Sequence, residues 1–302
     1  YPLYYGTKKS DIAVGLFYLI VKIEYNLDKN KKTLQRFLRK LFPVEIKFIV
    51  HLKKYTPTMK LSKNLNNYSL TSRKSFEGIT VDEAIIVQSF EFAYEMAYGE
   101  GFHRNCRSGG QSSRSKSEIF QNTFQGKMAE GILYENLKKQ GIETEMPDFS
   151  IHGKGIWDDA DLKANGKTIC IKSAAFFSNL LLLETKDWDS EGHYIPNISH
   201  KNASHSYDYF VLVRIKPDIK LLLKDGVDDK GVLLQKIKAE TWLYDVPGCC
   251  SIKTIQHIIA NECILPQNAM LNGKTKMDAS NYYIQAGLLF PIELLYEALH
   301  KI

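Results

Sequence analysis

The residues best suited to chemistry lie on either side of a predicted tight turn. Asp161 precedes the dipeptide Asn165-Gly166, and Cys170 and Lys172 follow Asp161 at separations of nine and eleven positions. An Asn-Gly pair favours a type I′ turn, because both residues tolerate a positive φ, and so predicts two antiparallel strands. Side chains alternate along a strand, which places Cys170 and Lys172 on one face. A carboxylate and an ammonium converge on one point if Asp161 lies opposite them.

This convergence suits the metal-assisted cleavage of a phosphodiester bond. An aspartate supplies the oxygen ligands that Mg²⁺ prefers, and a lysine orients the attacking water and offsets the charge that develops on the phosphate. A plain hairpin with exposed charges is the alternative interpretation. The same letters recur at Asp28 and Glu45-Ile46-Lys47, but those residues lack a tight turn and the glutamate lies in a lysine-rich run. We therefore place the chemistry at the Asn165-Gly166 hairpin.

Three predicted elements must position the hairpin. Apolar residues at helical spacing predict a helix from about Ser117 to Lys139 that stops at Gly141. An aromatic and β-branched run over 207–215 predicts a central strand that pairs beside the hairpin. Thr80 is the predicted cap of an earlier helix that runs through residue 96. Together these elements predict an α/β fold with a central mixed β-sheet flanked by helices.

This order of elements resembles the PD-(D/E)xK nuclease superfamily, best known from the type II restriction endonucleases. The similarity covers roughly residues 117–215, from the helix through the hairpin to the central strand. It implies that Asp161 is the metal-binding aspartate, that Lys172 is the catalytic lysine, and that Glu130 is an additional acidic residue beside the metal. It also implies a Mg²⁺-dependent, sequence-specific endonuclease of double-stranded DNA, which is a homodimer where the target is palindromic.

Cys170 departs from this pattern, because the superfamily has Asp or Glu in its place and a thiolate selects softer metals than Mg²⁺. Three explanations are open. A carboxylate from elsewhere, Glu130 or Asp159, fills the place; the chain is an inactive variant; or the fold binds DNA without cleaving it. The last is our alternative function, a DNA-binding protein with a catalytically degenerate or mutated nuclease fold. A structural or assembly protein with no affinity for DNA is a third hypothesis.

Positive charge is concentrated at the start of the chain. The net charge is +6, yet residues 1–75 hold 16 Lys and Arg against 4 Asp and Glu. Such a segment attracts a polyanion through phosphate contacts, and a solvated face without a ligand is an equal alternative. We expect a basic helix over 34–41, a strand over 44–52 and a linker over 55–74. The predicted domains are a basic N-terminal α+β region, 1–75, for DNA recognition or embrace, and a nuclease-like domain, 76–302.

Two polar stretches offer further contacts to DNA. The first, 102–116, is rich in Gly and Ser and carries our predicted DNA-binding residues, Arg104, Arg107, Arg114 and Lys116. The second, 174–206, holds several His, Ser and Asn residues and is expected to form loops between the hairpin and the central strand. A connector without contacts is the alternative interpretation of each stretch.

Composition limits the remaining function classes. The sequence has no run of about 20 apolar residues, which argues against a membrane span. Its five scattered cysteines suit a reducing cytosol better than a disulfide framework, so we expect a cytoplasmic protein. Cys249-Cys250, His257 and Cys263 are zinc-type ligands without a C-x-x-C pair. The apolar stretch 282–299, with Pro291 near a helix start, is expected to pack in the core or form a dimer surface.

Overall fold

The computed structural model describes residues 59–99, 114–150, 161–198, 206–224, 226 and 228–300. The chain divides into two compact units, 1–50 and 51–302, and the described residues all belong to the second. The predicted boundary at residue 75 therefore falls inside the second unit. The helix expected over 34–41 and the strand expected over 44–52 lie outside the described residues, so they stay predictions.

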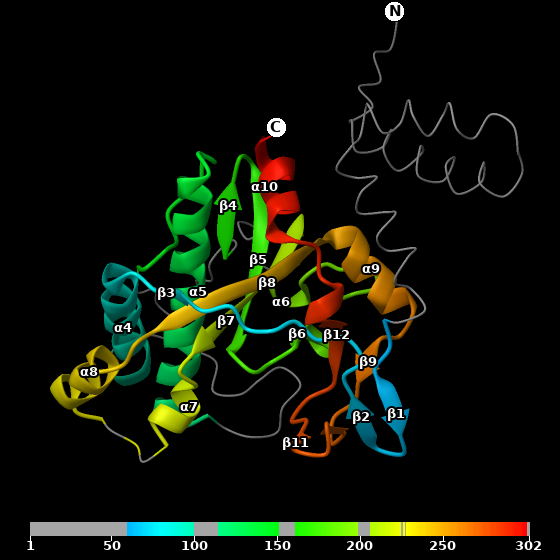
Figure 1. The fold of residues 1–302 in the computed structure, drawn as a ribbon, viewed down its shortest axis with the longest axis horizontal. Helices are drawn as coiled ribbons and strands as arrows, with labels where there is room; N and C mark the ends of the chain where they lie inside the picture. Colours follow the sequence, from blue (N-terminus) through cyan, green and yellow to red (C-terminus); the bar gives the residue numbers. More distant parts are fainter. Residues whose placement is uncertain are drawn as a thin grey trace, which may run out of the picture. The chain divides into compact units, whose positions relative to one another are not determined.

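A mixed five-stranded sheet forms the centre of the second unit (Figure 1). In spatial order its strands are β3 (Ile79–Thr80), β8 (Leu243–Ser251), β7 (Tyr209–Lys216), β5 (Lys167–Ala175) and β4 (Leu162–Ala164). β5 and β7 run parallel, and the other neighbours are antiparallel. β7 is buried along most of its length, which suits its aromatic and β-branched residues. The predicted α/β class, mixed sheet and central strand are confirmed.

Two long helices, α4 (Glu83–Tyr98) and α5 (Lys116–Lys139), pack against each other beside this sheet (Figure 1). α5 begins with a capping box between Ser115 and Glu118, so the predicted start is confirmed within two residues. The predicted cap of α4 was wrong. Thr80 belongs to β3 and pairs with Leu243, so the helix starts later, and Asp82 is the residue whose side chain accepts from a first-turn N–H.

Two smaller sheets extend the unit beyond the central one. Two linker predictions were wrong here, because 55–74 contains β1 and β2, and 174–206 contains β6. β2 and β6 gain partners from far along the chain, since β2 pairs with β10 and β6 with β12. The strands are β6 (Leu180–Glu184), β12 (Asn281–Gln285) and β9 (Ile264–Leu265) in one sheet, and β1 (Ser62–Asn64), β2 (Asn67–Ser69), β10 (Met270–Leu271) and β11 (Thr275–Lys276) in the other.

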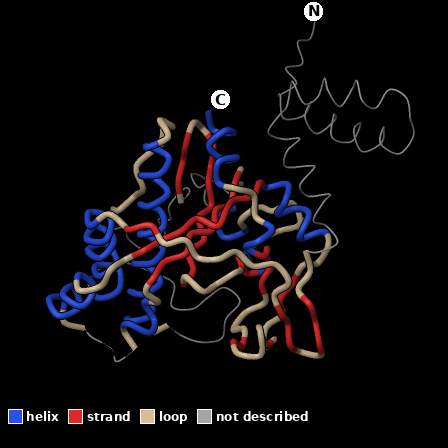
Figure 2. Tube along the Cα trace, in the orientation of Figure 1, coloured by secondary structure: helices blue, strands red, loops and turns tan. Residues whose placement is uncertain are grey.

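The remaining helices are short and lie around the strands (Figure 2). The helix predicted near Pro291 is observed as α10, which contributes buried residues to the core as expected. The helices are α6 (Ile195–Ile198), α7 (Ile219–Leu222), α8 (Lys230–Lys238), α9 (Ile252–Ala260) and α10 (Ile292–His300), with single 3₁₀ turns η2 (Thr185–Asp187) and η3 (Ala286–Leu288).

The two faces of the central sheet are covered by different parts of the chain. α5 lies on one face, where Gln125 Nε2 donates to Ser173 Oγ at 3.2 Å. Trp188 packs on the opposite face, with its ring centre 5.3 Å from that of Phe210. Because successive residues of a strand point to opposite faces, Lys172 points to the Trp188 face, away from α5. The sheet thus separates Lys172 from the helix that carries Glu130.

Candidate active site at the open edge of strand β5

The predicted hairpin is present, and its turn has the expected geometry. Asn165 and Gly166 have φ of 45° and 70°, the positive values of a type I′ turn. β4 and β5 pair antiparallel, with Leu162 opposite Ile169. The next position places Asp161 opposite Cys170, so the hairpin brings Asp161 to the part of β5 that carries Lys172. This hairpin is the local device that assembles the candidate site.

Asp161 is held in place by the backbone of the neighbouring strand. Its Oδ2 accepts a hydrogen bond from Ile171 N at 2.6 Å. This bond continues the pairing of β4 and β5 by one step, with a carboxylate in place of a backbone carbonyl. One oxygen of Asp161 is therefore engaged with the strand, and a carboxylate oxygen has lone pairs left for a second partner.

Lys172 remains a cation at neutral pH. Burial by itself lowers the pKa of its ammonium, but the neighbouring Cys170 and Asp161 raise it more, so the pKa lies above the ordinary value. Because the Cys170 thiol has a raised pKa, the Asp161 carboxylate is the partner that stabilises the ammonium. The site therefore holds one carboxylate and one ammonium side by side.

Cys170 is a buried, neutral thiol between these charges. Its side chain is 1% exposed, and burial raises the pKa of the thiol to about 12. The nearby Lys172 lowers this pKa and Asp161 raises it, but burial has the largest effect. A protonated thiol is a poor ligand for any cation, and Mg²⁺ prefers oxygen in any case. This chemistry disfavours a catalytic or metal-binding role for Cys170.

A cleft of about 600 Å³ opens along the edge of β5; Lys172 is part of its lining, and Asp161 is not. β4 pairs only with residues 167–169, so beyond Ile171 that edge of β5 has no strand partner among the described residues. Asn122 and Gln125 of α5 line one side of the cleft, and Leu182 of β6 with Trp188 and Tyr194 lines the other. Lys172 lies in the lining of this cleft as a partly buried residue.

Two carboxylates that sequence reasoning missed line the same cleft. Glu184 ends β6 and Asp187 ends the following 3₁₀ turn. The apolar run Leu180–Leu183 directly before Glu184 was the signal for a buried strand, and it was read as part of a polar connector. Mg²⁺ usually takes one or two protein carboxylates and keeps several waters. Glu184 and Asp187 match that number, whereas Asp161 is not in the lining and no cluster of three potential ligands occurs in the described part of the chain.

Glu130 does not line the cleft. It lies on α5, where its carboxylate forms an ion pair with Lys127 at 2.7 Å. Lys127 is itself buried, with its ammonium 5.0 Å from the ring centre of Phe92 and 5.7 Å from that of Phe149. The pair neutralises a buried cation on the far side of the sheet from Lys172. Asp159, the other predicted substitute for the missing acid, lies outside the described residues.

The predicted DNA-binding residues are placed unequally. Arg104 and Arg107 lie outside the described residues. Arg114 lines the cleft beside β5. Lys116 is the first residue of α5, where its ammonium lies 6.0 Å from the ring centre of Tyr98, and it is not part of the lining. Of the four cations, Arg114 is thus the one that the described residues bring to the candidate site.

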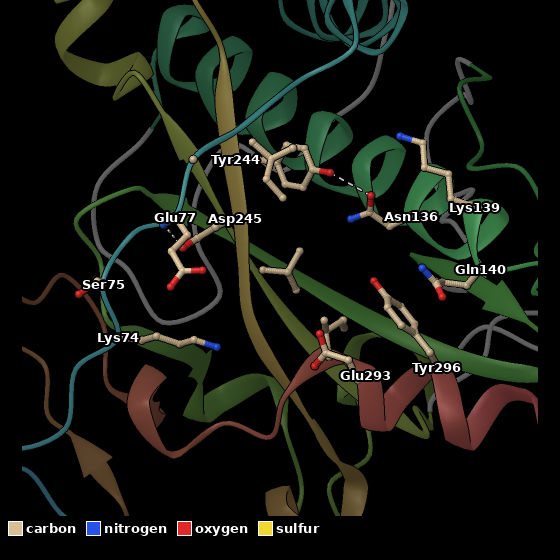
Figure 3. A pocket seen from close by; sticks show the side chains of 14 residues that line it. Lys74, Ser75, Glu77, Asn136, Lys139, Gln140, Tyr244, Asp245, Glu293 and Tyr296 are labelled. Carbon is tan, nitrogen blue, oxygen red and sulfur yellow. Dashed lines mark hydrogen bonds between the residues drawn. The ribbon is translucent and has the colours of Figure 1, made fainter.

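A second cavity, of about 520 Å³, lies between the end of α5, the start of α10 and β8 (Figure 3). Tyr244 donates its hydroxyl hydrogen to Asn136 Oδ1 at 2.9 Å at one side of it. Lys74 and Glu293 approach from opposite walls, and both are exposed. Burial raises the pKa of Tyr296 to about 12. No residue of the Asp161 hairpin lines this cavity.

The proposed zinc ligands are not gathered into a site. Cys249 and Cys250 are successive residues of β8, so their side chains point to opposite faces of the sheet. Both thiols are buried, and burial raises the pKa of each above its ordinary value. Their position in the strand is explained by packing.

A comparison of the chain with known protein families, with curated proteins and with solved structures gives no match in any of the three. Within the described residues, no helix has both the length and the apolar character that a membrane crossing requires. The function must therefore be argued from the geometry of the cleft itself.

Proposed function

We propose that the chain is a Mg²⁺-dependent nuclease that hydrolyses phosphodiester bonds in DNA, with a fold resembling that of the restriction endonucleases. The observation that carries this proposal is the Asn165-Gly166 hairpin, which brings Asp161 beside Lys172 at the edge of a cleft of about 600 Å³. Its finer form, drawn from the resemblance, is a sequence-specific cut in double-stranded DNA by a cytoplasmic homodimer.

In this proposal the acidic residues bind the metal and the basic residue contacts the phosphate. Asp161, with Glu184 or Asp187, would hold Mg²⁺, which when bound supplies Lewis-acid stabilisation of the phosphate and a more acidic water. The Lys172 ammonium donates to a phosphate oxygen and orients the water that attacks the phosphorus. Its raised pKa keeps it protonated throughout this step. The hydrogen bond from Ile171 N holds the Asp161 carboxylate against β5, next to Lys172.

One observation favours a second candidate function, which is DNA binding without cleavage. The buried thiol of Cys170 occupies the place where the resemblance expects a carboxylate. A site that lacks this acid holds a divalent cation less tightly, because fewer charged oxygen ligands surround it. The fold would then retain a cleft for nucleic acid and lose the reaction.

The test is incubation of the full chain with phage-length duplex DNA and with single-stranded DNA, in Mg²⁺, in Mn²⁺ and in a chelator. We expect metal-dependent cleavage, and discrete bands from the duplex if the cut is sequence-specific. Lys172→Met should lower the rate at least about 100-fold, because it removes a charge that stabilises the transition state. Lys74→Met, a lysine of the second cavity, is the matched control and should leave the rate unchanged.

The outcomes separate the candidates. Salt-sensitive DNA binding without cleavage under either metal would replace the nuclease by the binding protein. Equal rates for Lys172→Met and the parent chain would show that the cleavage arises elsewhere. Absence of DNA binding even at low ionic strength, where phosphate contacts are strongest, would exclude both candidates.

A further inference from the structure

Phe177 is an exposed aromatic residue at the end of the candidate cleft. It follows β5 by two residues, lines the cleft and is 60% exposed. Burying a phenylalanine side chain is favourable, so a ring that stays exposed beside a cleft is available to a stacking partner. The position of its ring depends on how firmly hydrogen bonds fix the turn that carries it.

The turn is tied to the sheet by three hydrogen bonds. Phe176 N donates to Ile215 O at 2.9 Å, and Ser178 N donates to Ala175 O at 2.8 Å. Arg214 Nη1 donates to Ser178 O at 3.2 Å. Arg214 is fully buried and also forms an ion pair with Asp245. The exposed position of Phe177 is therefore set by the sheet beneath it.

The ring is supported by a chain of aromatic contacts. Phe177 meets Phe176 edge to face, with ring centres 5.3 Å apart, and Phe176 meets Phe76 in the same way at 5.8 Å. The Arg214 guanidinium lies 5.6 Å from the ring centre of Phe76. Edge-to-face contacts are a favourable geometry for aromatic pairs. The Phe177 ring, which is the last of this series, is supported by Phe176 on one side and exposed to solvent on the other.

Cations lie around this aromatic platform. The ammonium of the exposed Lys216 is 5.4 Å from the ring centre of Phe176, and Arg114, Lys172 and Lys220 line the cleft. Glu184, Asp187 and Asp218 line it too, so the lining charges balance. The net charge of the lining therefore does not explain why an anionic molecule would bind in this cleft. An aromatic face next to cations is, however, the arrangement that holds a single nucleic-acid strand, with the base on the ring and phosphates on the cations.

We propose that Phe177 stacks an unpaired base of the strand that enters the cleft, so that single-stranded or locally unpaired DNA is preferred over intact duplex. This inference rests on the proposed nuclease function, and it replaces the double-stranded substrate implied by the resemblance with single-stranded or locally unpaired DNA. A base inside a duplex is already stacked on both sides, and it must leave the stack to reach the ring, which costs free energy. An unpaired base does not bear that cost.

The test is the dissociation constant for a short fluorescein-labelled oligothymidylate and for a fully paired duplex of the same length, measured by anisotropy with the full chain in a chelator. Phe177→Ala should weaken single-strand binding by about 5- to 100-fold, the range that loss of one stacked base gives. Phe177→Trp should restore it, because indole stacks at least as well as phenyl. Leu65→Ala, which alters a side chain 89% exposed in the β1–β2 turn, is the matched control and should change nothing.

Unchanged single-strand affinity in Phe177→Ala would overturn the platform, and so would an equal loss for the duplex. Either result leaves the nuclease standing if Lys172→Met still abolishes cleavage. Conversely, if Phe177→Ala loses single-strand affinity as expected but the parent chain does not cleave DNA, the stacking role of Phe177 is supported and the nuclease activity is excluded. Because Phe177 is exposed, neither variant should alter the urea midpoint of unfolding.

Discussion

The two cavities of the described unit have similar sizes, about 600 and 520 Å³, but they hold their charges differently. The cleft beside β5 keeps Lys172 against the Asp161 carboxylate, on paired strands. In the cavity between α5 and α10, Lys74, Glu77 and Glu293 are exposed, and the buried Asp245 is already paired with Arg214. Water screens exposed charges, whereas charges at a less hydrated wall act strongly on what binds there.

The difference also concerns rigidity. Lys172 lies in the middle of a nine-residue strand that pairs with β7 over residues 169–175. Lys74 and Glu77 belong to an irregular segment, and Glu293 to the first turn of α10. A site on a strand holds its groups more reproducibly than a site on a loop. Size and polarity alone would rank the cavities as equals, and the support beneath the charged groups distinguishes them.

The largest expected effect comes from a residue that serves both cavities. Asp245 lines the α5–α10 cavity and holds Arg214, which in turn holds the Phe177 turn at the cleft. Asp245→Ala would leave a buried guanidinium without its carboxylate, at a cost of about 3–5 kcal/mol in the free energy of unfolding. Glu91→Ala, which breaks the exposed pair with Lys230, should cost about 1 kcal/mol or less. Urea denaturation measures both, and similar losses would contradict the importance of burial.

An intermediate effect is expected from restoring the missing acid at the cleft. Cys170→Asp places a carboxylate between Asp161 and Lys172, and it should lower the Mg²⁺ concentration for half-maximal cleavage by about tenfold, since ligand charge sets affinity. Glu293→Asp, in the other cavity, should leave the Mg²⁺ dependence unchanged. The readout is the cleavage rate over a Mg²⁺ titration. The same midpoint in parent and Cys170→Asp would show that residue 170 does not limit metal binding.

The smallest expected effect is in the alkaline pH dependence. An unfolded thiol ionises near its ordinary pKa of 9.0, while native Cys170 stays protonated up to about 12. The stability that this adds is present below pH 9 and is lost as the pH rises toward 12. Between about pH 9 and 10 the parent chain should lose about 1 kcal/mol more than Cys170→Ala.

Tyr296 is the matched control in the other cavity. Burial also raises its pKa to about 12, but from an ordinary value of 10.0, so its contribution begins to fall one pH unit later. Between about pH 9 and 10, the Tyr296→Phe variant should therefore still show most of the loss in free energy of unfolding that the parent chain shows. Free energies of unfolding in urea at both pH values test this, and parallel curves for the parent and Cys170→Ala would contradict the burial of the thiol.

Local chemistry decided which elements the sequence revealed. The Asn165-Gly166 turn was predictable because few dipeptides tolerate two positive φ values, and α5 because its periodicity spans many turns. β6 and the β1–β2 hairpin were missed because tertiary pairing completes them. Leu61 N donates to the Tyr283 hydroxyl across 222 positions, for example, and no local pattern reports such a bond. Short strands have little signal of their own.

The candidate site was predictable to the same extent. Asp161 and Lys172 belong to one hairpin, so their meeting follows from register alone. Glu184 and Asp187 reach the cleft through β6, which pairs with β12 near the end of the chain. Phe177 gave no signal, because a phenylalanine after a strand reads as a core residue until its exposure is known. Glu130 has the spacing of a helper residue, but the sheet lies between it and Lys172.

Asp161 has a structural role besides its proposed catalytic one, and this affects how its presence in related sequences is interpreted. Its carboxylate accepts from the first backbone N–H of β5 beyond the pairing with β4, so it also terminates the sheet there. Open strand edges invite unwanted association, and an inward-pointing charge is one way to guard them. A related protein that had lost its catalytic activity would still use this aspartate to terminate the pairing of the sheet. Lys172 makes no such backbone contact in the hydrogen bonds described above, so we expect its retention or loss to be the better marker of activity.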